Sequence, residues 1–360
     1  IGVANNELTW ETTSEVDLGF DLGVWERAVV TADWYRKRTD DLLLFVDLPS
    51  ESGFGRALIN AGSVENRGIE LGVNVDMLRG DDRRVGWRTS FNYARNRNEV
   101  VDLGGDDEIR ASTISDDFKL GGTVVRVGQP IGVFVGYRTA GIVRDSTHAA
   151  ELAGIVNTVS AARYRPGDVI FVDTDGNDTI NVRDRQVIGS PHPDFTLGWQ
   201  NTVSFRGLEL TGLLTGTFGN EILNLNLWRL TGGDLATNVL RERYTDRWTP
   251  ANPDAKYPRF GVNTVGAGTT DYNDLILEDG SYLRLKTLSL SYTLPERWVV
   301  RRGFSRARLY VTGTNLVTWT DYQGFDPEVS SFGVGNLNRG IDIGSYPSAR
   351  SVTVGFNFAY

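Results

Sequence analysis

The sequence of 360 residues contains no cysteine, one methionine and two histidines. Without cysteine there are no disulfides and no thiolate metal ligands, and the two histidines lie far apart, so no pair has metal-ligand spacing. The absence of free thiols suits an oxidising cell envelope. The net charge of -9 disfavours nucleic acid as a partner.

Long hydrophobic runs are also missing. The longest apolar run covers residues 42–46, whereas a membrane-spanning helix needs roughly 18 to 20 apolar residues. A strand of a membrane barrel needs only about 9 to 11 residues of alternating character, so a membrane protein is still allowed. The chain starts at Ile1 without a methionine or an export signal. We therefore expect it to be a piece of a longer precursor.

What the sequence does contain is alternation of apolar and polar residues with period two. Residues 352–360 alternate in this way and end on Tyr360. This predicts a strand with Val352, Val354, Phe356, Phe358 and Tyr360 facing lipid and the other side chains facing a wet lumen. The terminal ring suits the aromatic girdle at a membrane interface.

The same alternation predicts three hairpins with short turns, at residues 16–34, 69–93 and 195–214. The expected turns are Trp25-Glu26, Gly80-Asp81-Asp82 and Arg206-Gly207. The polar side chains predicted to face the lumen are Glu70, Asn74, Asp76, Arg88, Asn92, Gln200 and Arg206. Between residues 282 and 294 the apolar positions slip from odd to even numbers, which predicts a β-bulge.

Together with residues 42–46, 132–142 and 309–311, these patterns predict about ten to twelve strands. Long irregular segments are expected at 98–130, 144–193, 220–275 and 319–347. Short turns at one end and long loops at the other are typical of outer-membrane barrels. A soluble β-sandwich with insertions is the alternative, but loops of this length are uncommon in compact domains.

Eight phrases of the sequence also occur in the order typical of one family. They are NAGSVENRGIE (60–70), GQPIGVFVGY (128–137), PGDV (166–169), DRQVIGSPHPDF (184–195), LEDGSYLRLK (277–286), TNL (314–316), GFDPE (324–328) and YPSAR (346–350). Together they closely resemble the C-terminal barrel half of SusC/RagA-like TonB-dependent outer-membrane transporters. The resemblance spans nearly the whole chain.

The resemblance implies an all-β fold, a transmembrane antiparallel β-barrel of about 22 strands with long extracellular loops. Residues 1–360 would supply about half of it, and the plug domain, the TonB-binding segment and the signal peptide would lie outside this chain. The implied function is active import of oligosaccharides or peptides across the outer membrane of a Gram-negative bacterium. The implied partners are a SusD-like surface lipoprotein, the TonB complex and the surrounding lipid. A passive porin or a surface adhesin is the alternative.

One acidic loop has the spacing of a calcium site. In residues 173–184 oxygen-bearing side chains occupy relative positions 1, 3, 5 and 12, with a backbone carbonyl at position 7, as in loops that wrap a hard cation. The candidate ligands are Asp173, Asp175, Asn177, Thr179 and Asp184. The alternative is an acidic loop whose carboxylates accept hydrogen bonds from its own backbone. Apart from this structural calcium, no cofactor is expected.

Loop aromatics are candidates for contact with a ligand or with a lid protein. They are Trp228, Tyr244, Tyr322, Phe325 and Phe332. Rings of this kind stack on sugars, and they equally serve as packing for their own loops. Asp326 and Glu328 have the composition of a glycosidase pair, but they lie in a loop phrase that the resemblance already explains. We therefore expect no enzyme activity.

Overall fold

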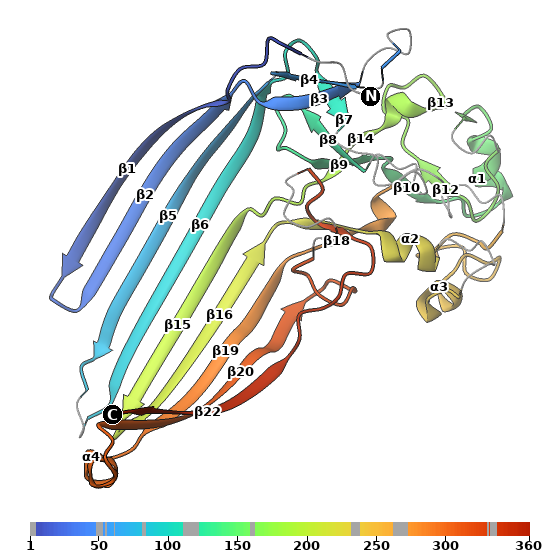
Figure 1. The fold of residues 1–360 in the computed structure, drawn as a ribbon. Helices are drawn as coiled ribbons and strands as arrows, with labels where there is room; N and C mark the ends of the chain where they lie inside the picture. The colour runs from blue at the N-terminus through green and yellow to red at the C-terminus, as the bar shows by residue number, and fades with distance from the viewer. Residues whose placement is uncertain are drawn as a thin grey trace.

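The structure, a computed structural model, describes residues 5–47, 53–54, 56–60, 62–80, 84–110, 122–158, 163–231, 238–261, 273–329, 331 and 337–360. Within these ranges, nine long strands form one antiparallel sheet, here called the wall. In spatial order they are β1 (Thr12–Val24), β2 (Ala28–Asp40), β5 (Ser63–Leu78), β6 (Gly86–Asp102), β15 (Phe195–Phe205), β16 (Leu208–Phe218), β19 (Tyr282–Thr293), β20 (Arg306–Thr320) and β22 (Ser351–Ala359). The wall is curved, as Figure 1 shows. The predicted all-β barrel fold is confirmed.

The pairing register sorts the side chains of the wall into apolar and polar rows. One apolar row crosses eight strands through Leu22, Val30, Val73, Phe91, Trp199, Leu214, Leu285 and Val317. The row next to it, on the opposite face, is Asp21, Thr31, Gly72, Asn92, Gly198, Thr215, Arg284 and Thr318. One face of the wall is therefore apolar and suited to lipid, and the other is polar and suited to a lumen.

The register also confirms the predicted faces of the terminal strand and of the central hairpins. Val354 pairs with Val311 and Phe356 with Leu309, so both belong to apolar rows. On the polar face Asp76 accepts a hydrogen bond from Arg88 at 2.8 Å. Arg206 differs from its prediction because it lies in a turn, with its guanidinium 5.0 Å from the centroid of the Phe205 ring.

Two of the predicted turns have the backbone that tight hairpins require. Arg206 and Gly207 have φ angles of 49° and 83°, and Trp25 and Glu26 have φ angles of 49° and 52°. Positive φ at consecutive turn positions matches the right-handed twist of the flanking strands. A Cβ on Gly207 would lie 2.7 Å from the carbonyl oxygen of Thr293, so glycine is needed there. Of the third predicted turn, Asp81 and Asp82 lie outside the described residues.

The predicted bulge is confirmed at Lys286 in β19. Leu213 of β16 pairs with Thr287, and the next residue, Leu214, pairs with Leu285, so Lys286 is the extra residue. The insertion returns the leucines on both sides of the bulge to the apolar face. The partner strand β20 is irregular at the same height, where Asn315 has a φ angle of 51°.

The long connections gather at one end of the wall, here called the loop end, and the short turns at the other, the turn end (Figure 1). The long connections fold into small sheets. Three of these sheets have two strands: β3 (Leu43–Asp47) with β4 (Arg56–Asn60), β10 (Thr139–Ile142) with β12 (Val169–Phe171), and β11 (Val156–Asn157) with β13 (Thr179–Ile180). A four-stranded sheet has the spatial order β14 (Gln186–Gly189), β9 (Val133–Gly136), β8 (Thr123–Arg126) and β7 (Glu108–Arg110). A three-stranded sheet has the order β18 (Leu277–Asp279), β17 (Glu221–Asn224) and β21 (Ile341–Asp342). Short helices α1 (Ser146–Glu151), α2 (Leu225–Thr231) and α3 (Arg241–Thr245) accompany them.

This organisation corrects two expectations. The strands predicted within 42–46 and 132–142 exist, but they belong to loop-end sheets, so the wall has nine strands in the described residues instead of ten to twelve. The segments expected to be irregular contribute buried residues such as Ile188, Leu223 and Ile341 to one apolar cluster. Within the described ranges no helix is long and apolar enough to cross a membrane.

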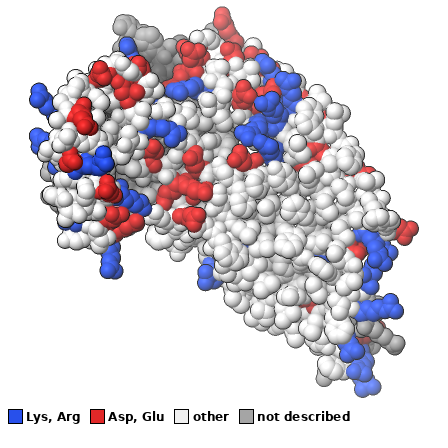
Figure 2. Space-filling view, turned by 180° about the vertical axis from the view of Figure 1, so that it is seen from behind, with Lys and Arg blue, Asp and Glu red and all other residues white. Residues whose placement is uncertain are grey.

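Charged residues follow the same division. Figure 2 shows a face with a broad area almost free of charged side chains, and charged residues gathered toward the loop end and at the opposite tip. Many large apolar side chains of the wall are exposed, among them Phe20, Trp199 and Val354. A water-soluble protein rarely exposes so much apolar surface.

Candidate functional site

A buried arginine connects the polar face of the wall to the loop that follows β20. Arg284 lies in the polar row on β19, and its side chain is 2% exposed. Its Nη2 donates to Oδ1 of Asp326 over 2.5 Å, and its Nη1 donates to Oε2 of Glu328 over 2.9 Å. We call these three residues the arginine clamp. It holds the loop across the polar face at the loop end.

Further hydrogen bonds complete the surroundings of the two carboxylates. The hydroxyl of Tyr282 donates to Oε1 of Glu328 over 2.7 Å, and Nζ of Lys286 lies 3.0 Å from Oε2. The backbone N–H of Ser348 donates to Oδ2 of Asp326 over 2.9 Å. Because Lys286 is the bulge residue, the insertion adds a second cation at the clamp.

The clamp keeps both carboxylates ionised. Burial by itself would raise the pKa of Asp326, but hydrogen bonds from Arg284 and Ser348 outweigh burial and hold this pKa at about 2. For Glu328 burial is again outweighed, by hydrogen bonds from Tyr282 and Lys286, so its pKa is also lowered. A glycosidase needs one carboxyl with a raised pKa as general acid. The pKa values of Asp326 and Glu328 are both shifted in the opposite direction, so the pair fits a structural anchor better than a glycosidase pair.

Two cavities adjoin the clamp. One, of about 400 Å³, is lined by Asp326, Glu328, Ser331, Ser345 and Tyr346 among others. The other, of about 300 Å³, is lined by residues that include Asn220, Tyr282 and Arg339. The buried Oδ1 of Asn220 has no hydrogen-bond partner in the part of the chain that the structure describes. Both cavities combine charged groups, hydroxyls and a tyrosine ring, which suits a polar ligand.

The predicted loop aromatics occupy different environments. Phe325 is 79% exposed and Tyr244 is 57% exposed. Tyr322 is 5% exposed, packs with Ile222 and Val329, and donates a hydrogen bond to Asp342 over 2.5 Å. Trp228 packs against the apolar cluster around Leu223. Phe332 lies outside the described residues. Phe325 and Tyr244 thus present rings to solvent, whereas Tyr322 and Trp228 serve as packing.

The ring of Tyr244 belongs to a larger cation and aromatic group on the segment 241–261. The guanidinium carbon of Arg247 lies 4.3 Å from the centroid of Tyr244 and 5.3 Å from that of Phe260. Beneath them the buried Arg243 donates to the carbonyl of Pro258, and burial lowers its pKa to about 10. Arg259 pairs with the buried Asp168 over 2.9 Å. This segment is therefore fastened to the 163–171 segment.

The acidic loop brings three of its predicted ligands together. Carboxylate oxygens of Asp173, Asp175 and Asp184 all lie within 4.8 Å of one another. Asp173 accepts hydrogen bonds from the backbone N–H groups of Gly176, Asn177 and Asp178. The side-chain oxygen of Asn177 accepts from the backbone N–H of Thr179. The loop thus has the backbone hydrogen bonds of the alternative interpretation, and calcium binding stays a prediction.

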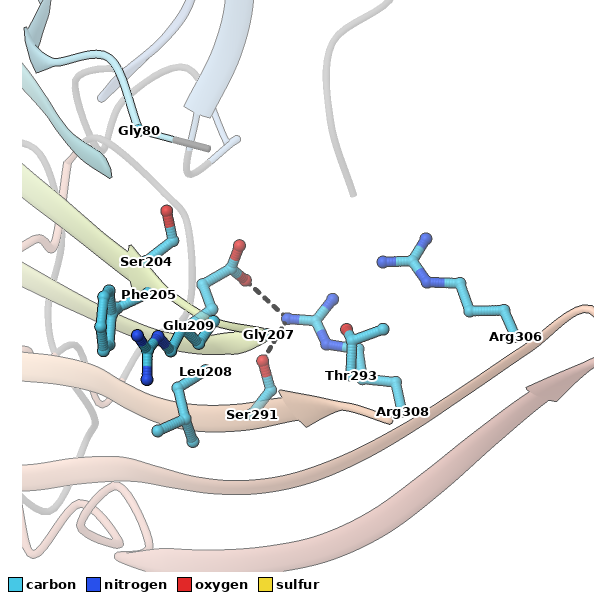
Figure 3. A pocket seen from close by; sticks show the side chains of 11 residues that line it. Gly80, Ser204, Phe205, Gly207, Leu208, Glu209, Ser291, Thr293, Arg306 and Arg308 are labelled. Carbon is cyan, nitrogen blue, oxygen red and sulfur yellow. Dashed lines mark hydrogen bonds and ion pairs between the residues drawn. The ribbon is translucent and has the colours of Figure 1, made fainter. Parts of the chain in front are cut away.

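A polar pocket of about 260 Å³ lies at the turn end (Figure 3). Arg308 donates to Glu209 over 2.6 Å and to Ser291 over 2.7 Å. Arg306 extends toward the same pocket from the beginning of β20 (Figure 3). Ser291 and Glu209 are paired in one polar row, and the turn residues Arg206 and Gly207 also line the pocket, so the pocket lies where the polar row meets the turn.

Comparison with known proteins agrees with this geometry. The family described as "TonB dependent receptor-like, beta-barrel" matches residues 1–207. The chain belongs to this family. The TonB-dependent receptor P26 of Formosa agariphila is 35% identical over 99% of this chain. The TonB-dependent receptor SusC of Bacteroides thetaiotaomicron is 26% identical, also over 99% of the chain.

A solved structure described as the RagAB peptide transporter superimposes with a TM-score of 0.78, at 24% identity over 99% of this chain. The resemblance to SusC/RagA-type TonB-dependent receptors is thereby confirmed. The chain spans about a third of the relatives it matches, 35% of P26 and 36% of the RagAB chain. It is one part of a TonB-dependent receptor barrel, and such barrels lie in the outer membrane.

Sequence reasoning missed the role of Arg284, although the residue lies in one of the quoted phrases. The available signal was an arginine between Leu283 and Leu285, which places a cation on the polar face of a strand. Its partners could not be inferred, because Asp326 follows 42 residues later in the chain.

Proposed function

We propose that the full-length protein is a TonB-dependent importer of oligosaccharides or peptides, and that this chain supplies part of its wall and its extracellular loops. The observation that carries the proposal is the arginine clamp. It fastens the loop after β20 over the polar face and leaves cavities with polar linings beside it. A folded loop end of this kind favours selective capture over free diffusion.

Uptake by the full-length protein tests the energy coupling. Cells expressing it should accumulate a labelled oligosaccharide or peptide ligand only when TonB is present and the inner membrane is energised. A strain without TonB, with the barrel shown to be folded, is the control. Uptake that persists in this strain would contradict active import and favour the passive porin.

The proposed partner at the loop end is a SusD-like surface lipoprotein. Support comes from the exposed rings of Phe325 and Tyr244, since aromatic side chains and arginine are enriched at protein interfaces. Replacing both rings by alanine should reduce co-purification of the lipoprotein at least severalfold. Trp25→Ala is the control, because Trp25 is an aromatic residue that is also exposed but lies in a turn at the opposite end of the wall. Equal loss in both variants would contradict a lid contact at these rings.

A further inference from the structure

The connection between β19 and β20 differs from the other turns at the same end of the wall. The turns at 25–27 and 206–207 contain three and two residues between paired positions. Residues 294–305 instead build a short helical segment, α4 (Glu296–Val299) followed by the 3-10 turn η4 (Val300–Arg302). The segment ends at Gly303, whose φ angle of 81° is the left-handed conformation common after helices.

This helical connection leans on the lipid-facing side of the wall. The ring of Phe304 lies 5.0 Å from that of Phe358 and 5.1 Å from that of Tyr360, measured between centroids. Phe358 also contacts Phe356 at 5.5 Å, and Phe356 belongs to an apolar row. The connection is therefore continuous with the surface that meets lipid, and Figure 1 shows α4 beside the C-terminus.

The exposed side chains of the connection combine apolar and cationic groups. Trp298 is 49% exposed, and Val300 is exposed as well. Arg297 and Arg301 are exposed, lie four residues apart in consecutive helical turns, and form no ion pair with any residue that the structure describes. Glu296 is the one acidic side chain of the segment. Lys and Arg side chains gather at this tip in Figure 2, although the whole chain carries a net charge of -9.

We propose that the connection 294–305 binds anionic phospholipids of the inner leaflet of the outer membrane. Short turns of such barrels face the periplasm, so this end of the wall meets the phospholipid leaflet. Trp298 and the ring cluster occupy the interfacial zone, where aromatic side chains are favoured. Arg297 and Arg301 donate to the lipid phosphate, which a guanidinium matches with two parallel N–H groups. The proposal depends on the barrel lying in the membrane and is independent of what the protein imports.

Lipid preference in mixed micelles tests the proposal. The full-length protein is equilibrated with equal amounts of phosphatidylglycerol and phosphatidylcholine that carry the same acyl chains, and the bound lipids are counted by native mass spectrometry. The wild type should retain mainly phosphatidylglycerol. In the double variant Arg297→Gln, Arg301→Gln the ratio of bound phosphatidylglycerol to bound phosphatidylcholine should fall about fivefold for each arginine removed. One cation near an anionic surface contributes a factor of that order.

Two further variants keep the result interpretable. Arg183→Gln with Arg241→Gln removes two exposed arginines from the loop end and should leave the lipid preference unchanged. Trp298→Ala should weaken retention of both lipids equally, because the Trp298 ring contributes to lipid binding independently of the headgroup charge. Folding of every variant is checked by the heat-dependent shift of barrels on gels. An unchanged preference in the 297/301 variant, an equal loss in the 183/241 variant, or a wild type without preference would overturn the proposal.

Discussion

The wall and the loop end are built from one chain but place their apolar side chains in opposite ways. In the wall, large residues such as Phe20, Leu210 and Phe356 are exposed. At the loop end, residues of the same kind, such as Phe134 and Ile341, are fully buried. Strands in lipid must pair every backbone group within the barrel, so backbone hydrogen bonds dominate the wall. The loop end is held by side-chain packing, as in a soluble domain.

Charged pairs show the same contrast. In the wall Arg88 and Asp76 form an ion pair whose arginine is exposed to the lumen, and such pairs contribute at most about 1 kcal/mol. At the loop end Arg284 is buried against two carboxylates. Removing one partner of a buried pair leaves the other charge uncompensated. The loop end should therefore respond to single substitutions of charge much more strongly than the lumen face does.

The largest effect should come from Arg284→Ala. It leaves Asp326 and Glu328 without their main partner and should destabilise the loop after β20 by about 3 to 5 kcal/mol. Limited proteolysis should then cut within 321–331 while the barrel stays folded. Arg88→Ala is the matched control and should cost less than about 1 kcal/mol. Equal protease resistance of the two variants would show that the clamp does not hold the loop.

A charge on the lipid face should have the next largest effect. Phe356→Asp places a carboxylate in an apolar row at the edge of the described wall, and a charge on the lipid face costs up to a few kcal/mol, with the cost falling toward the interface. The folded fraction of barrel should fall, as measured by heat-dependent gel mobility. Thr353→Asp is the control on the opposite face of the same strand and should assemble normally. If both variants assemble equally well, the assignment of faces is wrong.

Acidity should loosen the loop end before it affects the wall. The pKa of Asp326 is about 2 in the folded protein, below the value of about 3.9 for an unfolded chain. Its contribution, about 2 to 3 kcal/mol, is therefore present above pH 4 and is lost as the pH falls from about 4 to about 2. Pepsin, which is active throughout this window, should begin to cleave residues 321–331. Asp326→Asn should be cleaved at a rate that depends less on pH across the window, and the dependence that remains should come from Glu328, whose pKa is also lowered.

Calcium should have the smallest effect. If the ion binds the cluster of Asp173, Asp175 and Asp184, calcium at tenfold its dissociation constant stabilises the loop by about 1.4 kcal/mol. Hydrogen exchange of residues 172–184 should slow on adding calcium and recover with a chelator. Asp173→Asn should abolish the response, whereas Asp178→Asn should keep it, because Asp178 is outside the cluster. If the hydrogen exchange rate of these residues is the same with and without calcium, the loop does not bind calcium.

The wall was predictable from sequence because its physics is local. Alternation at period two places Val73 and Phe91 on one face and Asn74 and Asn92 on the other, and the register follows once the turns are known. The change of the apolar positions from odd to even numbers located the bulge to within a few residues. The resemblance to a known family then supplied the barrel around these strands.

The loop end was not predictable in the same way. Its strands contain two to five residues, too few for a periodic signal. Its stabilising contacts join distant segments, such as β17 with β21, which are more than a hundred residues apart. Single residues show the same limit. Nothing near Tyr322 in the sequence indicates that the Tyr322 hydroxyl donates a hydrogen bond to Asp342.

The bulge at Lys286 has an evolutionary consequence. One inserted codon adds a cation beside Glu328 while the leucines above and below keep their places against lipid. Gain or loss of that codon therefore changes the charge inside the barrel without changing the side chains that face the membrane. Related receptor barrels that bind different ligands can be expected to differ by such single-residue insertions in this strand, so that selection can alter the interior while the architecture is conserved.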